Sequence, residues 1–284
     1  GFERLIQDAY WRPGDDAGHP EIFSPTFRID AFMYGYHPDV VGPGGFKTRE
    51  FYGIQPRSFD DYMDFMVAEI ERRHKAGAVA LKCAEAYNRP LDFDAQDAAA
   101  ARRAWNKSKE KVARQDWLAF GNFVFARCAE TAARLNLPFQ VHQGLGQLHG
   151  TNPMRFLATI QQHPRTRFVL FHYGYPWLDE VHGIVHNCRN ALPDLTWLPL
   201  ISTAAAKRAL DECIEIAGDI RTIGWGSDCW TAEESAGALL AWRHVIAEVL
   251  ADKVASGYLT VRDAEKLCVM LVRDNGHFIY NLPA

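Results

Sequence analysis

Two histidines and one aspartate stand at the ends of short apolar runs in this sequence. His142 follows FQV, His172 follows FVLF, and Asp228 follows IGWGS. Two neutral imidazoles and a carboxylate are good ligands for zinc or a similar divalent ion. Such an ion lowers the pKa of a coordinated water from about 16 towards 7, and a nearby carboxylate can take up the released proton. The three residues therefore indicate a hydrolytic metal site with Asp228 as the base.

Each of these residues also has a purely structural explanation. A single histidine after an apolar run is more often a hydrogen-bonded core residue than a ligand, and a single aspartate at a strand end often caps the next helix. These structural explanations account more readily for one such residue at a strand end than for three in the same sequence. We therefore interpret His142, His172 and Asp228 as the metal ligands, with Asp228 as the catalytic base.

The apolar runs themselves predict a parallel sheet. Continuous apolar runs are typical of parallel strands covered on both faces, and the carboxyl ends of such strands meet at one rim. The runs lie at residues 3–10, 27–33, 78–84, 139–143, 168–172, 195–201 and 221–225. The polar residues that close them would gather at that rim, and they are Asp8, Asp30, Lys82, His142, His172 and Asp228.

Helix signals alternate with the strand signals. Ser58 with Asp61 and Thr231 with Glu234 match the starts of capped helices. Alternating strands and helices predict an α/β fold with right-handed crossovers, built either as an open doubly wound sheet or as a (β/α)₈ barrel.

The spacing of the glycines in one turn decides between these two folds. The segment GLGQLHG at residues 144–150 lacks the glycine spacing of a dinucleotide-binding turn, which an open sheet usually carries after its first strand. We therefore predict one (β/α)₈ barrel domain over residues 1–284, with strands 2 to 8 present and the first strand upstream of Gly1.

Composition restricts the class of partner. The chain has 284 residues, 48% of them hydrophobic, and a formal net charge of -4. A nucleic acid or an anionic membrane surface would require a clustered excess of Lys and Arg, so we expect a small-molecule substrate and no nucleic acid. No apolar run approaches the roughly 20 residues that span a bilayer. The six cysteines include no CxxC pair, which favours reduced thiols in a cytoplasmic protein.

Two further positions have several interpretations. Lys82 could be a buried ion-pair partner, a contact for a substrate anion, or a carbamylated ligand between two metals. His182 and His186 are spaced i, i+4 and could bind a metal on one helix face, but the HExxH glutamate is absent, which argues against such a site.

Several segments resemble the amidohydrolase superfamily, in particular the branch called amidohydrolase-2. They are VALKCAEAYNRPL (79–91), FQVHQGLGQLHGTNPM (139–154), RFVLFHYGYPW (167–177), TWLPLIS (196–202), IGWGSDCW (223–230) and VRDNGHFIY (272–280). The combination of VHxG, FHxGYP and GSD is the specific part of the resemblance. It implies a distorted barrel with a divalent metal at its top face, for which we expect Zn, with Mn or Fe as alternatives.

The resemblance also implies roles for single residues. His142 is similar to the strand-five metal ligand and Asp228 to the strand-eight ligand and proton shuttle. His172 is similar to the strand-six histidine that binds a second metal or assists catalysis, so His172 and Asp228 are the candidate catalytic residues. Some members of the family carbamylate the lysine at the strand-four position. By the resemblance Tyr87 and Arg89 look like substrate-facing residues, and with Lys82 and Trp230 they are the candidates for substrate binding. The side chains of Tyr87, Arg89, Trp177 and Trp230 suggest an anionic or ring-bearing ligand.

One feature of the family is missing from this sequence. Strand one normally ends in His-x-His, and no such pair occurs here. Either the first strand lies outside this chain or half of the metal site has been lost. The resemblance and the ligand set together predict a metal-dependent hydrolase that cleaves a C–N or C–O bond of a small polar substrate.

Three alternatives to this prediction follow from the same residues. The same ligands permit lyase or decarboxylase chemistry, or isomerase chemistry, because they can polarise a carbonyl without attack by water. A lost ligand pair would leave a barrel that only binds a ligand or partner.

An apolar helix at residues 235–250 is expected to pack mainly within one chain, with a homo-oligomer as the alternative.

Overall fold

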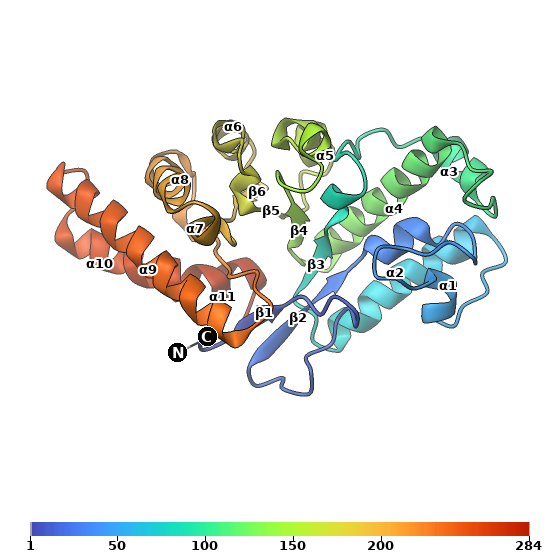
Figure 1. The fold of residues 1–284 in the computed structure, drawn as a ribbon, viewed down its shortest axis with the longest axis horizontal. Coiled ribbons are helices and arrows are strands. Elements are labelled where there is room, and N and C mark those ends of the chain that lie inside the picture. Colours follow the sequence, from blue (N-terminus) through green and yellow to red (C-terminus); the bar gives the residue numbers. More distant parts are fainter. Residues whose placement is uncertain (1, 284) are drawn as a thin grey trace. The chain divides into compact units, whose positions relative to one another are not determined.

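The computed structural model describes residues 2–283 and has an α/β fold with parallel strands (Figure 1). The order of the strands in the sheet equals their order in the sequence, which is what successive strand–helix crossovers produce. The strands are β1 (Leu5–Gln7), β2 (Phe23–Arg28), β3 (Ala80–Cys83), β4 (Phe139–His142), β5 (Phe168–Phe171) and β6 (Ala191–Pro193). The α/β class is thereby confirmed, and closure into a barrel stays a prediction.

The chain divides into two compact units. The first unit comprises Gly1–Gln140 and Ala158–Arg167, and the second comprises Val141–Leu157 and Phe168–Ala284. The expected organisation as one barrel domain stays a prediction. In the part of the chain that the structure describes, no helix has both the length and the apolar character needed to cross a membrane.

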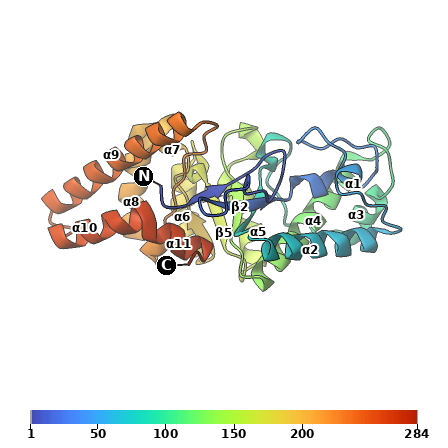
Figure 2. The same ribbon diagram turned by 90° about the horizontal axis from the view of Figure 1, so that it is seen from below.

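The first unit places helices beside strands β1 to β3. Ser58 caps α2 as expected, because its hydroxyl accepts a hydrogen bond from the Asp61 amide at 3.0 Å. Helices α2 and α4 lie side by side in both ribbon views (Figures 1 and 2). Short 3₁₀ turns follow β2 at Asp30–Tyr34 and β3 at Glu85–Tyr87. The helices are α1 (Thr48–Phe51), α2 (Phe59–Lys75), α3 (Ala98–Ala104), α4 (Arg114–Arg134) and most of α5 (Leu157–Gln162).

The second unit contains β5, β6 and the longest helix of the described residues. Thr231 and Glu234 form the predicted capping box at the start of that helix, α9. On its buried face Trp242 stacks on Trp225, with 5.8 Å between ring centroids, and its indole N–H donates to the Leu271 carbonyl at 3.3 Å. The helices are α6 (Leu178–Asn187), α7 (Leu198–Ile201), α8 (Thr203–Ile216), α9 (Ala232–Ala255), α10 (Val261–Val269) and α11 (Asn275–Tyr280).

Two of the predicted strands are wrong. The run at residues 195–201 contains a left-handed residue, Trp197 with φ +63°, and then the helix α7. Pro199 lies in the first turn of α7, where its fixed φ favours a helix start and its missing N–H weakens a strand. The run at residues 221–225 begins with a 3₁₀ turn, and only Gly224 forms an isolated parallel bridge, to Asp194.

Candidate active site

His172 follows β5 directly and lies in a strained part of the backbone. His172 and Tyr173 have φ values of +61° and +49°. This left-handed backbone conformation costs free energy for any residue other than glycine. The His172 ring is fully buried, and its Nδ1 lies 2.9 Å from the Thr196 carbonyl oxygen. Because a carbonyl oxygen only accepts, Nδ1 carries the proton and Nε2 is the nitrogen with a lone pair.

The Nε2 atom of His172 faces the other two predicted ligands. It lies 3.1 Å from Nδ1 of His142 and 3.7 Å from Oδ2 of Asp228. His142 is 3% exposed, whereas the Asp228 side chain is 45% exposed. The structure therefore brings His142, His172 and Asp228 together in the second unit, with two buried imidazoles on one side and a half-exposed carboxylate on the other.

Backbone hydrogen bonds hold the segment that carries Asp228. The Gly224 amide donates to the Pro193 carbonyl at 2.8 Å, and the Trp197 amide donates to the Gly226 carbonyl at 2.9 Å. A Cβ on Gly226 would lie 2.7 Å from the Thr196 hydroxyl, so glycine is what allows this close approach. Asp228 itself has φ +50°, the second left-handed ligand candidate in the site.

The donor atoms have the spacing that a divalent cation requires. Zinc bonds of about 2.0–2.1 Å at tetrahedral angles separate neighbouring donor atoms by roughly 3.3 Å. The separations of 3.1 and 3.7 Å around His172 Nε2 are close to this value. Two imidazole nitrogens and one carboxylate oxygen also match the ligand types of zinc and of neighbouring first-row metals. The residues present therefore fit a divalent ion.

A second polar cluster lies in the first unit, around Arg28 at the end of β2. Its guanidinium pairs with Asp8 and, at 3.3 Å, with Asp30, and it lies 4.6 Å from the centre of the Tyr10 ring. Burial alone would lower the pKa of Arg28, but the two carboxylates raise it above its ordinary value. Sequence reasoning named Asp8 and Asp30 as strand-end residues and missed Arg28, which looks like an ordinary strand residue in the sequence.

Glu85 is a second residue that sequence reasoning missed. It follows β3 in the turn Glu85–Tyr87, is fully buried, and accepts a hydrogen bond from the Tyr34 hydroxyl at 2.8 Å. Burial, with a smaller contribution from the charge of Asp30, raises the pKa of Glu85 to about 8. A buried carboxyl that keeps its proton at neutral pH is a candidate acid, so Glu85 belongs among the functional candidates of this unit.

Glu85→Gln is expected to flatten the pH dependence of stability. The folded-state pKa of about 8 lies above the ordinary value of 4.5, so the folded protein holds this proton more tightly. Stability therefore falls as pH rises from about 4.5 to about 8, by up to about 1.4 kcal/mol per pH unit. Glutamine cannot ionise, so the free energy of unfolding of the variant should rise relative to that of the wild type as pH increases across this range.

Urea unfolding at several pH values measures this effect. Glu50→Gln is the matched control, because Glu50 is exposed in the same unit and its replacement should leave the slope unchanged. Parallel stability curves for Glu85→Gln and the wild type would contradict the prediction.

The predicted substrate contacts differ in their surroundings. Lys82 is 3% exposed in β3, opposite Arg28 in the strand register, and its charge acts on Asp30. Tyr87 and Trp230 are 54% and 75% exposed, so both can reach a ligand from solvent.

Arg89 has a different environment from the one expected of a substrate contact. It is 1% exposed, and its guanidinium donates to the Leu118 carbonyl at 3.1 Å and the Asp92 carbonyl at 3.3 Å. It also donates to the side chain of Asn122. These interactions favour a structural role over the predicted contact with substrate.

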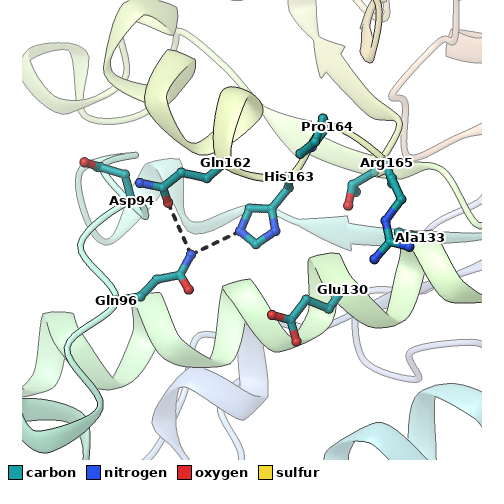
Figure 3. Close-up of a pocket in the computed structure, with 9 residues that line it drawn as sticks. Asp94, Gln96, Glu130, Ala133, Gln162, His163, Pro164 and Arg165 are labelled. Atoms are coloured by element: carbon teal, nitrogen blue, oxygen red, sulfur yellow. Dashed lines mark hydrogen bonds between the residues drawn. The ribbon is translucent and has the colours of Figure 1, made fainter.

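A cavity of about 670 Å³ lies elsewhere in the first unit (Figure 3). Gln96 crosses it, with its Nε2 at 3.2 Å from Gln162 Oε1 and at 3.2 Å from His163 Nε2. Its wall also includes Asp94, Glu130 and Arg165. Since its lining includes no predicted site residue, this polar cavity is separate from the candidate catalytic groups.

Solved structures with the same fold carry descriptions that belong to two reaction classes. A protein described as a metal-dependent hydrolase from Lactobacillus casei has 16% identity and a TM-score of 0.77, over 98% of this chain and 73% of that chain. A glucuronate isomerase from Caulobacter crescentus has 18% identity and a TM-score of 0.72, over 99% and 64%. A uronate isomerase from Thermotoga maritima has 15% identity and a TM-score of 0.66, over 98% and 67%. At these identities the likeness shows the fold alone.

The sequence itself identifies the family. A search of curated proteins returns no match. Residues 30–260, well over half of the chain, match the family model described as amidohydrolase. That range includes all three residues of the candidate metal site. The chain therefore belongs to the amidohydrolase family, as its VHxG, FHxGYP and GSD motifs predict.

Proposed function

We propose that this chain is a metal-dependent enzyme whose divalent ion is held by His142, His172 and Asp228. The observation that supports it most directly is the position of His172 Nε2, at 3.1 Å from a second imidazole nitrogen and at 3.7 Å from a carboxylate oxygen. We propose zinc, with manganese or iron as alternatives, and a divalent ion there would supply Lewis acidity towards a substrate oxygen or a water. The six free thiols support a reducing compartment such as the cytoplasm.

The protein groups have separate roles in this proposal. The Thr196 carbonyl accepts the Nδ1 proton of His172 at 2.9 Å and so fixes the tautomer that presents Nε2 to the site. Asp228 is half-exposed beside it, so its carboxylate can reach both the ion and a substrate that enters from solvent. Asp228 takes a proton from the attacking water and returns it to the leaving group, so water is added across a C–N or C–O bond of a small polar substrate.

Isomerisation is the second candidate function, because two of the structural neighbours are described as uronate or glucuronate isomerases. The same carboxylate would then move a proton between adjacent carbons of an aldose, and no water would be consumed. The donor set fits either reaction. The fate of solvent atoms separates the two.

We expect that oxygen from solvent water is incorporated into the product, which is the result that hydrolysis gives. The metal-loaded chain is incubated in ¹⁸O-water with a panel of N-acyl amino acids and lactones, and mass spectrometry should show one ¹⁸O in the released acid. Incubation with D-glucuronate in deuterated water should give no ketose. A ketose carrying solvent deuterium at carbon 1 would replace the hydrolase assignment by an isomerase, and no turnover with either kind of substrate would favour a protein that only binds.

A further inference from the structure

Helices α6 and α8 of the second unit bring three possible metal ligands together. Asp179 and His182 lie one turn apart on α6, and Glu212 comes from α8. His182 Nδ1 lies 3.3 Å from Glu212 Oε2 and 3.9 Å from Asp179 Oδ1. One donor atom of each residue lies within 4.8 Å of the donor atoms of the other two. None of the three belongs to the site formed by His142, His172 and Asp228.

The state of His182 points to a ligand that the protein chain does not itself provide. The residue is 8% exposed, and within residues 2–283 neither of its ring nitrogens has a hydrogen-bond partner of acceptable geometry. The Tyr173 ring packs against it, with 5.2 Å between centroids and the planes at 64°. Buried polar atoms normally have partners, so a buried imidazole nitrogen directed between two carboxylates requires an explanation.

A divalent cation bound between the two carboxylates explains the buried imidazole of His182. The separations of 3.3 and 3.9 Å from His182 Nδ1 are near the roughly 3.3 Å between donors of a tetrahedral zinc ion. The side chains of Asp179 and Glu212 are 75% and 46% exposed, so an ion can enter from solvent and complete its coordination with water. One imidazole and two carboxylates suit zinc and other late first-row metals better than calcium, which prefers an all-oxygen set.

Arg208 competes with a metal ion for the carboxylates of Asp179 and Glu212. Its Nη1 donates to Asp179 Oδ1 at 2.7 Å and lies 3.9 Å from Glu212 Oε1. The guanidinium neutralises part of their charge, and it shares with the ion the oxygen of Asp179 that faces His182. A metal ion and Arg208 should therefore exclude each other in part, so the affinity for metal depends on this arginine.

We propose that Asp179, His182 and Glu212 form a second divalent-metal site, which takes zinc and which Arg208 weakens. The site links α6 to α8 and adjoins Tyr173, which neighbours the catalytic candidate His172 in the chain. Its occupation would fix the relative position of the two helices.

Zinc stoichiometry tests the proposal. The full chain is stripped with a chelator, dialysed against Zn²⁺ and analysed for metal per chain. The wild type should bind one ion more than either His182→Asn or Glu212→Gln. His186→Asn is the matched control, since His186 is exposed one turn further along α6, and it should keep the full count. Equal zinc counts in the wild type and His182→Asn would overturn the proposal.

Arg208→Gln provides a test that removes no buried side chain. Loss of the competing guanidinium should tighten zinc binding at this site by about tenfold, measured by competition with a chromogenic chelator. In the wild type, saturating Zn²⁺ should also shift the imidazole NMR signals of His182. Zinc binding that leaves those signals in place, or an unchanged affinity in Arg208→Gln, would show that the cluster is only a salt-bridge network.

Discussion

Asp228→Asn is expected to lower turnover by about 10²- to 10⁴-fold while leaving the fold intact. The change keeps the volume of the side chain but removes a proton acceptor and one negative charge from the group 3.7 Å from His172 Nε2. Loss of a positioned general base costs a factor of this size. The Asp228 side chain is 45% exposed, so its replacement buries no new polar group and should change stability little.

The measurement compares turnover, metal content and thermal unfolding for the variant and the wild type. Turnover is followed with whichever substrate the isotope experiments identify. Asp252→Asn is the matched control, because Asp252 is an exposed aspartate of α9 in the same unit and the chemical change is identical. Assays at saturating metal separate the loss of a base from the loss of a ligand. Full activity of Asp228→Asn at wild-type metal content would remove Asp228 from the reaction.

The candidate ligands could be found from the sequence because of where they stand. His142 and His172 end apolar runs that are β4 and β5, or follow them directly, and strand ends are positions that a pattern of apolar residues can locate. The position of Asp228 could not be predicted from the period of the apolar residues alone. The predicted strand before it is an isolated bridge at Gly224, and Asp228 reaches the histidines through backbone bonds to residues 193–197.

Residues whose role depends on distant partners were beyond sequence reasoning. Glu85 matters because Tyr34, 51 positions away, donates to it and because folding buries it. The sequence places His182 beside His186 on one helix, whereas the structure brings Glu212 of another helix to 3.3 Å from His182 Nδ1. Such contacts depend on tertiary packing, which leaves no recognisable spacing in the sequence.

Arg89 shows the same limit for a predicted substrate contact. A charged residue in the loop after a strand is a reasonable ligand contact, but here the guanidinium is buried against α4. A Cβ on Gly121 would lie 2.2 Å from its Nη1, so a glycine in the middle of α4 makes room for the arginine. An isolated glycine inside a helix usually has a packing reason, and Gly121 is the sequence signal that could have indicated one.

Arg89→Met is therefore expected to destabilise the protein by roughly 3–5 kcal/mol, because it removes a charged donor from three acceptors that are buried or partly buried. Those acceptors are the carbonyls of Leu118 and Asp92 and the side chain of Asn122. Urea unfolding measures the loss. Arg114→Met is the matched control, since both guanidiniums lie 5.9 Å from the Trp117 ring and Arg114 is exposed on α4.

The two possible roles of Arg89 give opposite results. If the arginine is structural, Arg89→Met unfolds at clearly lower urea concentration than Arg114→Met, and the folded fraction keeps its affinity for substrate. If the arginine binds substrate, the variant keeps its stability and KM rises instead. Burial favours the first result, because a guanidinium that is 1% exposed and directed to protein carbonyls can reach an incoming ligand only after those hydrogen bonds break.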